Sequence, residues 1–292
     1  MLLPRFTYHR PASLAEALAI LAEHQGQAAV LAGGTDLLVG MKHKLLKPAH
    51  VVGLEVLEGL NQVEEQEDAL LIGPMLTAAA LARQPQVRAQ ARALALGAGV
   101  LGSPQVRNRA TVGGNVCNAR PAADMCVPLL ALGATALLQS QQGRREVPLA
   151  EFFLGPGRTV RAPGELLCGL RVPAGGPGTG SGYEKLGLRK ALEIALVNVA
   201  AVLTLEPDGR TVKAARVALG AVAPTPILCP GAEKVLKGQV LSEDLCRRAA
   251  TAAAADARPI DDHRGSAAFR RQEVEVLTRR ALQQAWQAAR QG

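Results

Sequence analysis

A chain of 292 residues, 48% hydrophobic and 20% charged, has the composition of a globular protein and is long enough for two domains. Its formal charge of +8 is scattered, and aromatic residues make up only 2%, which disfavours a dedicated nucleic-acid-binding protein. The five cysteines show neither a C-x-x-C pair nor zinc-ligand spacing, so we expect free thiols and no metal site. Neither a signal peptide nor a run of about 20 apolar residues is recognisable, so a cytoplasmic location is expected.

The first 54 residues predict a compact α/β unit. Ser13 and Glu16 have the spacing of a capping box, which marks the N-terminus of a helix that we expect to end near Gly26. The rest of the unit alternates between apolar strands and a helix, with a strand over 28–32, a helix over 37–44 and a strand over 51–54.

Residues 55–175 predict a second unit of strands and alanine-rich helices. Thr77 has the position of a helix N-cap. Further helices are expected over 90–99 and 121–133, the latter starting near Ala123. Strands are expected over 69–73, 135–139, 145–147 and 166–172, the middle two forming a hairpin around Gln142-Gly143.

A tract rich in glycine and proline, residues 173–182, predicts a linker, and we place a domain boundary near residue 176. The elements beyond it predict an antiparallel sheet followed by helices. The strands are 183–186, 197–205 and 213–219, with a hairpin turn at 207–209, and the helices are 233–236, 242–255 and 273–290. The predicted domains are therefore 1–175 and 176–292.

Two double-glycine turns, 33–36 and 111–115, suggest a phosphate-binding function. Glycine removes the Cβ atoms that would keep a ligand from the backbone, and such a loop can direct several N–H groups at a phosphate. Neither turn has the G-x-G-x-x-G or P-loop spacing. Two such turns in one chain suggest a pyrophosphate held from both sides, as in a dinucleotide or similar cofactor. The alternative for the first turn is a tight strand–helix connection with Asp36 as a cap.

Asp124 is a candidate for ribose binding, because it follows small residues that leave space beside a helix start. Thr111 and Asn115 carry side chains suited to phosphate or ring edges, and Asn118 is another polar residue at a position where a core helix would have an apolar one. The alternative for Asp124 is a helix N-cap.

This ordered set of motifs resembles the FAD-binding medium subunits of the molybdenum hydroxylases, the family of xanthine dehydrogenase, carbon monoxide dehydrogenase and aldehyde oxidase. The matching segments are residues 6–17, 31–38, 102–115, 121–124 and 183–186, together with the basic helical tail. The resemblance implies an α+β fold. A two-subdomain FAD-binding domain of the vanillyl-alcohol-oxidase (PCMH) type would be followed by a smaller domain of antiparallel sheet and packed helices, as in the carbon monoxide dehydrogenase flavoprotein.

The resemblance also implies roles for individual residues. The first turn would surround the pyrophosphate with backbone N–H groups from Val30, Leu31, Ala32, Gly33, Gly34, Thr35 and Asp36. The second segment would contact the pyrophosphate and the ribityl chain from the other side through Thr111, Val112, Gly113, Gly114 and Asn115. Asp124 would bind ribose hydroxyls, and Leu101 would lie near the isoalloxazine ring. Leu167 and Lys185 would contact the flavin from either side of the linker, although Lys185 alone also fits a surface lysine.

The implied function is electron transfer by non-covalently bound FAD, with no catalytic side chain and no metal in this chain. Molybdopterin and [2Fe-2S] clusters are expected only in partners, namely a small [2Fe-2S] subunit and a large molybdopterin subunit in a dimer of heterotrimers. The loop 187–195 departs from relatives that use nicotinamide nucleotide, with Glu193 where Asp is common, so the electron acceptor stays open. The absence of a four-cysteine insertion argues against an extra iron–sulfur cluster.

Three other interpretations stay open at this point. The first is a stand-alone flavin oxidoreductase of the vanillyl-alcohol-oxidase type, in which Cys117 is the one cysteine placed for covalent flavin attachment near the glycine turns. The second is a binding module without a redox role, and the third is nucleic-acid binding through the basic surface.

Overall fold

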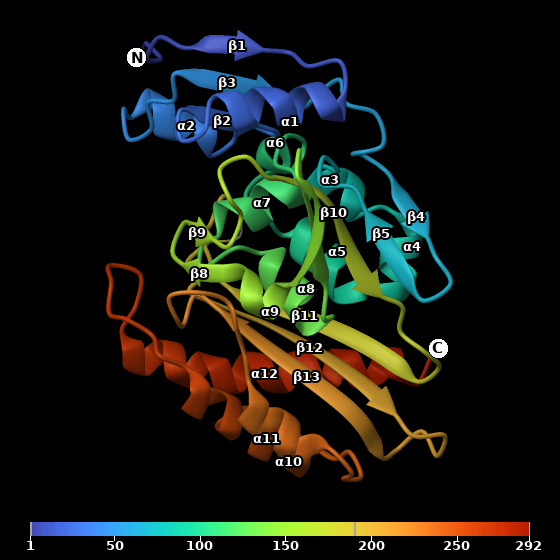
Figure 1. The fold of residues 1–292 in the computed structure, drawn as a ribbon. Helices are drawn as coiled ribbons and strands as arrows, with labels where there is room; N and C mark the ends of the chain where they lie inside the picture. The colour runs from blue at the N-terminus through green and yellow to red at the C-terminus, as the bar shows by residue number, and fades with distance from the viewer. Residues whose placement is uncertain (1, 190, 292) are drawn as a thin grey trace.

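Three larger sheets and a two-stranded hairpin make up the β-structure of the computed structural model, which describes residues 2–189 and 191–291 (Figure 1). The N-terminal unit lies at one end of the molecule, a larger helix-rich unit occupies the middle, and the C-terminal sheet with its long helices lies at the other end. This arrangement confirms the predicted α+β fold with a second, sheet-rich domain.

The N-terminal unit is a parallel sheet in the order β1-β3-β2. Parallel neighbours need crossover connections, and here helices provide them. The predicted N-cap is confirmed, since Ser13 Oγ accepts from the N–H of Glu16 (3.2 Å). The second bond of a capping box is shifted by one residue, because Glu16 Oε2 accepts from the N–H of Ala12 (2.8 Å) rather than from that of Ser13. The elements are β1 (Thr7–His9), α1 (Leu14–Glu23), β2 (Ala28–Leu31), α2 (Leu37–Lys42) and β3 (His50–Gly53).

The middle unit is an antiparallel sheet in the order β4-β5-β10-β6-β7, with helices between its strands. Its strands are β4 (Val63–Glu65), β5 (Ala69–Ile72), β6 (Thr135–Ser140), β7 (Gly143–Pro148) and β10 (Leu166–Pro173), beside the small hairpin of β8 (Phe153–Gly155) and β9 (Arg158–Thr159). Its helices are α3 (Ala78–Leu81), α4 (Pro85–Gln90), α5 (Arg92–Gly99), α6 (Pro104–Arg107), α7 (Val112–Asn118), α8 (Cys126–Ala131) and α9 (Leu149–Phe152). The hairpin of β6 and β7 and the N-cap at Thr77 are confirmed.

Two helix predictions in this unit differ from the structure in their bounds. The helix expected over 90–99 is α5, which begins two residues later at Arg92, because Ala91 leaves the helical region (φ −134°, ψ 47°) between α4 and α5. The helix expected over 121–133 is shorter: α8 begins only at Cys126, because the chain first passes through the buried Asp124.

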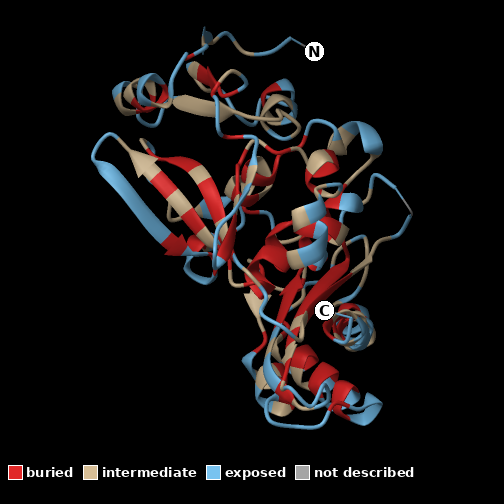
Figure 2. Ribbon diagram, turned by 90° about the vertical axis from the view of Figure 1, so that its right-hand side faces the viewer, coloured by how far each residue is buried: buried red, intermediate tan, exposed pale blue. Residues whose placement is uncertain are grey.

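The C-terminal sheet is antiparallel in the order β11-β12-β13-β14, and the long helices pack on it. The strands are β11 (Thr179–Leu186), β12 (Val197–Leu205), β13 (Val212–Gly220) and β14 (Ile227–Leu228), and the helices are α10 (Pro230–Leu236), α11 (Glu243–Asp256) and α12 (Ala267–Ala289). Figure 2 shows the strands of this sheet largely buried and the helices buried on their inner faces.

The predicted linker 173–182 is only partly a loop, because β11 already begins at Thr179. Gly180 and Gly182 are strand residues that let α12 lie directly on the sheet. A Cβ atom at Gly180 would lie 2.2 Å from the carbonyl oxygen of Ala285, and one at Gly182 would lie 2.4 Å from that of Ala281. Close helix approach, rather than flexibility, accounts for this part of the tract. The domain boundary near residue 176 stays a prediction.

Within the described ranges, none of the helices combines the length and the apolar character needed to cross a membrane.

Candidate functional site

The first glycine turn connects β2 to α2 and exposes a row of backbone donors. Gly34 has φ +77°, the left-handed region that favours glycine. The N–H groups of Gly33, Gly34, Thr35 and Asp36 have no hydrogen-bond acceptor among the residues that the structure describes. Asp36 occupies the N-cap position of α2, but its side chain makes no capping hydrogen bond. Four consecutive unpartnered N–H groups form the kind of concavity that binds an anion.

We expected a loop at the second glycine segment, but the segment forms the first turn of α7. Thr111 is its N-cap, with extended backbone angles, and Thr111 Oγ1 accepts from the N–H of Gly114 (3.1 Å). The N–H groups of Val112, Gly113 and Asn115 also have partners within the protein. This segment therefore differs from the first turn, because its backbone donors are already used.

The glycines of the second segment permit close approach. A Cβ atom at Gly113 would lie 2.5 Å from Pro74 Cβ, so this position is closed by packing. A Cβ atom at Gly114 would meet only Thr111 Oγ1 within 4 Å, at 2.9 Å. Beside Gly114, the space next to the helix start is therefore open for a ligand.

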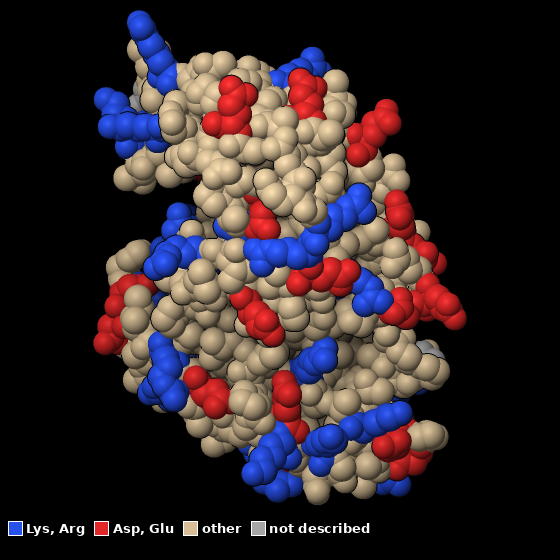
Figure 3. All heavy atoms as spheres, viewed as in Figure 1, with Lys and Arg blue, Asp and Glu red and all other residues tan. Residues whose placement is uncertain are grey.

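The two glycine segments meet where the N-terminal and middle units adjoin. A Cβ atom at Gly33 would lie 2.0 Å from the carbonyl oxygen of Arg109, two residues before Thr111. In Figure 1, α6 and α7 lie directly below the N-terminal unit. Figure 3 shows the surface hollowed on one side at this level, with Lys and Arg side chains on both margins. Positive charge around such a hollow favours an anionic ligand.

Asp124 forms the centre of a buried polar network that joins the middle unit to the C-terminal sheet. Tyr183 Oη donates to Asp124 Oδ1 (2.8 Å), and Lys185 Nζ donates to Asp124 Oδ2 (2.7 Å). Asn198 Nδ2 donates to Tyr183 Oη (3.1 Å). Asp124 is therefore no helix cap, since Met125 is the N-cap residue of α8. Each carboxylate oxygen keeps a second lone pair, so the group can still accept a further hydrogen bond.

Burial and charge oppose each other in this network. Burial raises the pKa of Asp124, and the Lys185 ammonium partly counteracts that rise. Burial and the neighbouring carboxylate also raise the pKa of Tyr183, so its hydroxyl stays protonated and donates. The side chains of Asp124 and Lys185 are only 8% and 10% exposed, which makes their ion pair a well-shielded one.

The other predicted residues extend this arrangement on both sides. Asn115 Oδ1 accepts from the N–H of Met125 (3.2 Å) and so connects α7 to the segment that carries Asp124. On the other side, Lys185 Nζ lies 3.4 Å from the carbonyl oxygen of Val100, next to the buried Leu101. A path of contacts thus runs from the first glycine turn through α7 and Asp124 to Leu101.

A hollow of about 620 Å³ lies at the Leu101 end of this path. Its wall includes Gly102 and Glu193, and the loop 187–195 contributes three exposed apolar side chains, Leu188, Leu192 and Ile194. Lys185 Nζ donates to the carbonyl oxygen of Glu193 (3.0 Å), which ties this loop to the polar network. The volume falls within the range of small-molecule sites.

Leu167 is the predicted residue that no described contact joins to the path. Its side chain is buried in the core of the middle unit, and its strand pairs with Leu138 of β6. A register shift between Leu167 and Gly169 places a β-bulge there, a feature often found beside functional sites.

Sequence reasoning missed Asn198, which is fully buried and leaves its Oδ1 without a partner in the described part of the chain. The signal was present, since an amide within the apolar run of β12 is unusual. It also missed a cluster of His9, His24 and His50, because residues from three elements converge only in the folded chain.

Both parts of the chain match known family models. Residues 4–175 match the FAD binding domain in molybdopterin dehydrogenase, and residues 183–285 match the CO dehydrogenase flavoprotein C-terminal domain.

Relatives match over nearly the whole chain. The carbon monoxide dehydrogenase medium chain of Hydrogenophaga pseudoflava is 36% identical over 286 residues, which cover 98% of this chain and 99% of that protein. The xanthine dehydrogenase FAD-binding subunit of Escherichia coli O157:H7 is 33% identical, with 97% of each chain covered.

Solved structures show the same similarity. Carbon monoxide dehydrogenase from Hydrogenophaga pseudoflava, in a form lacking the Mo-pyranopterin moiety, superposes with a TM-score of 0.94 at 36% identity over 99% of each chain. Quinoline 2-oxidoreductase from Pseudomonas putida 86 does so with a TM-score of 0.92 at 31% identity, over 99% of this chain and 100% of that one.

Proposed function

The chain belongs to the family of FAD-binding subunits of molybdenum hydroxylases, and on this premise we propose that it transfers electrons from iron–sulfur clusters of a partner to an external acceptor. It is a flavoprotein subunit of an oxidoreductase. Bound FAD supplies the redox chemistry, because a flavin can take electrons from one donor and pass them to another. The protein's part is to bind and orient that cofactor.

The observation that carries this proposal is the Gly33–Asp36 turn, with its four unpartnered N–H groups beside the open start of α7. These donors suit a pyrophosphate. We propose that the residues from Val30 to Asp36 bind the pyrophosphate, while Thr111 to Asn115 approach it from the opposite side.

The same proposal gives roles to the polar network. Asp124 binds ribose hydroxyls through its free lone pairs, and Lys185 places positive charge near the ring. Leu101 and Leu167 contact the flavin. In this scheme residues 1–175 carry FAD, and residues 176–292 complete the site through β11.

The proposed partners are a small [2Fe-2S] subunit and a large molybdopterin subunit, assembled as a dimer of heterotrimers. The support is the full-length similarity to the medium chain of carbon monoxide dehydrogenase and to a chain of quinoline 2-oxidoreductase. Hydroxylation of the substrate then takes place in another chain.

A Gly114→Ala variant tests the cofactor site. The added methyl group would lie 2.9 Å from the capping Thr111 hydroxyl, which must shift, while alanine favours a helix more than glycine does. These effects oppose each other, so the stability of the FAD-free protein should change by less than about 1 kcal/mol. FAD affinity should nevertheless fall at least about tenfold, or ~1.4 kcal/mol. Flavin absorption after dialysis against graded FAD concentrations measures it.

Gly155→Ala is the matched control, because a Cβ atom there meets nothing within 4 Å and φ is not positive. If the FAD affinity of Gly114→Ala is unchanged, the proposed placement of the ligand beside the start of α7 is wrong.

Electron transfer itself is tested by mixing the FAD-loaded chain anaerobically with its reduced [2Fe-2S] partner. Bleaching of the flavin band is expected, and its absence would overturn the relay.

The stand-alone flavin oxidoreductase is less well supported. Covalent attachment would need a reactive thiol near the site, but burial raises the pKa of Cys117, which keeps it protonated and a poor nucleophile. Acid precipitation should therefore release all flavin into the supernatant. A protein mass increased by that of FAD after denaturation would favour the alternative.

A further inference from the structure

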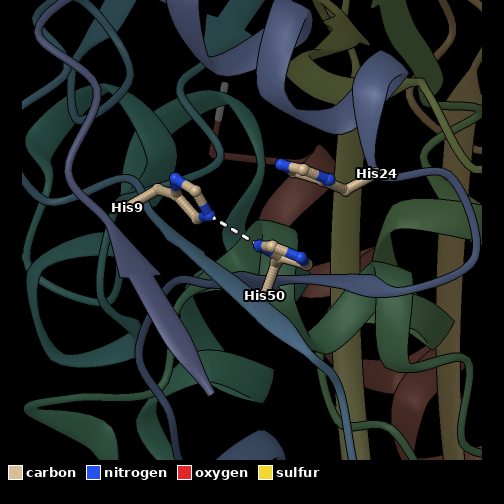
Figure 4. Close-up of side chains that lie close together, drawn as sticks. All are labelled: His9, His24 and His50. Atoms are coloured by element: carbon tan, nitrogen blue, oxygen red, sulfur yellow. Dashed lines mark hydrogen bonds between the residues drawn. The ribbon is translucent and has the colours of Figure 1, made fainter.

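Three of the five histidines of the chain lie together on the N-terminal unit, away from the polar network of Asp124 (Figure 4). One ligand nitrogen from each of His9, His24 and His50 lies within 4.8 Å of the other two. His9 Nε2 and His50 Nδ1 are 2.9 Å apart, and the rings of His24 and His50 are stacked with centroids 3.7 Å apart.

The fold holds these residues in place from three elements. His9 ends β1 and His50 begins β3, two strands that pair in parallel. His24 is the C-cap residue of α1, and its carbonyl oxygen accepts from the N–H of Ala28, whose strand partner is His50. The cluster is thus fixed by backbone hydrogen bonds rather than by one mobile loop.

The chemistry of the cluster is that of a metal ligand set. Imidazole nitrogen is the usual protein ligand for Zn²⁺ and similar ions, and three histidines with a fourth open position form a known type of zinc site. Ligand nitrogens about 2.0–2.1 Å from a tetrahedral ion are roughly 3.3 Å apart, and here the His9 and His50 nitrogens are 2.9 Å apart, with all three ligand atoms within 4.8 Å of one another. Metal binding requires the side chains to reorient, because the stacked rings of His24 and His50 are parallel (interplanar angle 4°) and must converge on an ion.

The surroundings also favour a cation. Glu23 Oε1 lies 3.9 Å from His24 Nε2 and is within reach as a fourth ligand or as charge compensation. The three side chains are half-buried, so an ion can enter from solvent.

We propose that His9, His24 and His50 form a binding site for a divalent transition-metal ion, with Zn²⁺ as the best fit. The ion ties β1, the end of α1 and the central strand β3 together. His50 pairs with Ala28 at the start of β2, whereas the Gly33–Asp36 turn follows Leu31 at the end of that strand. The proposed role of the ion is therefore structural, in a small unit whose own buried core is limited.

The test uses the full chain without an affinity tag, loaded with FAD and treated with a chelator. Co²⁺ is titrated while its visible absorption is recorded, and Zn²⁺ affinity is then measured by displacement of Co²⁺. We expect one equivalent of tetrahedral Co²⁺, displaced by one equivalent of Zn²⁺, and a rise in Tm with either ion. His9→Ala, His24→Gln and His50→Asn should each weaken binding at least about 100-fold and abolish the rise in Tm.

His43→Gln is the matched control, because this histidine lies in the same unit at the end of α2 but outside the cluster. It should bind both ions as the wild type does. The flavin spectrum of each variant reports folding, because His9, His24 and His50 lie outside the residues proposed to contact FAD. Absence of a one-equivalent Co²⁺ signal in the wild type, or equal affinity in flavin-loaded cluster variants, would overturn the proposal.

Discussion

At the residue scale, the ion pair between Asp124 and Lys185 links two units across a buried interface. Lys185→Met removes the ammonium group. The buried carboxylate of Asp124 then keeps only its hydrogen bond from the Tyr183 hydroxyl, in surroundings with little solvent. Breaking such a pair costs about 3–5 kcal/mol of the free energy of unfolding. Denaturant unfolding of the FAD-free protein should show this loss.

Two further variants separate the buried pair from a general charge effect. The double replacement Asp124→Asn with Lys185→Met should recover part of the lost stability, because no uncompensated charge stays buried. Arg247→Met removes an exposed partner of Asp244 and should cost less than about 1 kcal/mol. Equal losses for Lys185→Met and Arg247→Met would contradict a buried role for the pair.

The carboxylate of Asp262 predicts how stability depends on pH. The N–H of Arg264 and the Arg270 guanidinium lower the pKa of Asp262 from 3.8 to about 2. A pKa lower in the folded than in the unfolded state stabilises the fold above about pH 4, and this stabilisation is lost as the pH falls toward 2. The contribution is at most about 2 kcal/mol, because the side chain is still 21% exposed. In the Asp262→Asn variant, the free energy of unfolding measured between pH 5 and pH 2 should no longer show this part of the pH dependence.

At the scale of elements, the packing of α12 on β11 depends on two glycines. Gly180→Ala places a methyl group 2.2 Å from the backbone of Ala285, so the helix must shift. We expect a loss of about 1–3 kcal/mol in the free energy of unfolding. Gly176→Ala, four residues earlier, is the matched control, because a Cβ atom there meets nothing within 4 Å. If Gly180→Ala were as stable as Gly176→Ala, the close approach would not be a constraint.

Element prediction succeeded where a local signal determined the structure. The N-cap at Ser13, the N-cap at Thr77 and the hairpin around Gln142 depend on residues close in sequence, and all three are present. It failed where distant packing decides. Glycines at 180 and 182 indicate flexibility when only the local sequence is considered, but here they accommodate a helix about 100 residues later in the chain.

The same distinction applies to the candidate site. The glycine pairs were visible in the sequence, but the sequence did not show that their backbone N–H groups differ in hydrogen bonding. The N–H groups of the second segment donate within α7 and to residues near Pro74. The pairing of Asp124 with Lys185 and the involvement of Asn198 arise between units. No local pattern encodes them, and the predicted roles of these residues in FAD binding stay predictions.

At the scale of the whole molecule, the hollow at the end of the contact path is the surface most suited to meet an electron acceptor. Leu188 and Ile194 are 64% and 52% exposed there, next to a loop that Lys185 ties to the proposed cofactor site. Exposed apolar side chains around a hollow are typical of a surface that binds a partner or ligand. We therefore expect the acceptor to approach the flavin over this loop.

Leu188→Gln combined with Ile194→Gln tests this expectation, because glutamine removes apolar contact without adding charge. FAD content and flavin reduction by the [2Fe-2S] partner should be unchanged, because neither side chain lies in the polar network. Reoxidation by an apolar quinone should slow several-fold as apolar contact is lost, whereas reoxidation by the small anion ferricyanide should slow less. Leu154→Gln is the control, since it alters a similarly exposed leucine on β8. If the double variant is reoxidised by the quinone at the wild-type rate, the acceptor approaches the flavin from another face. The comparison with ferricyanide isolates the apolar contact, because nothing else in these variants distinguishes the two oxidants.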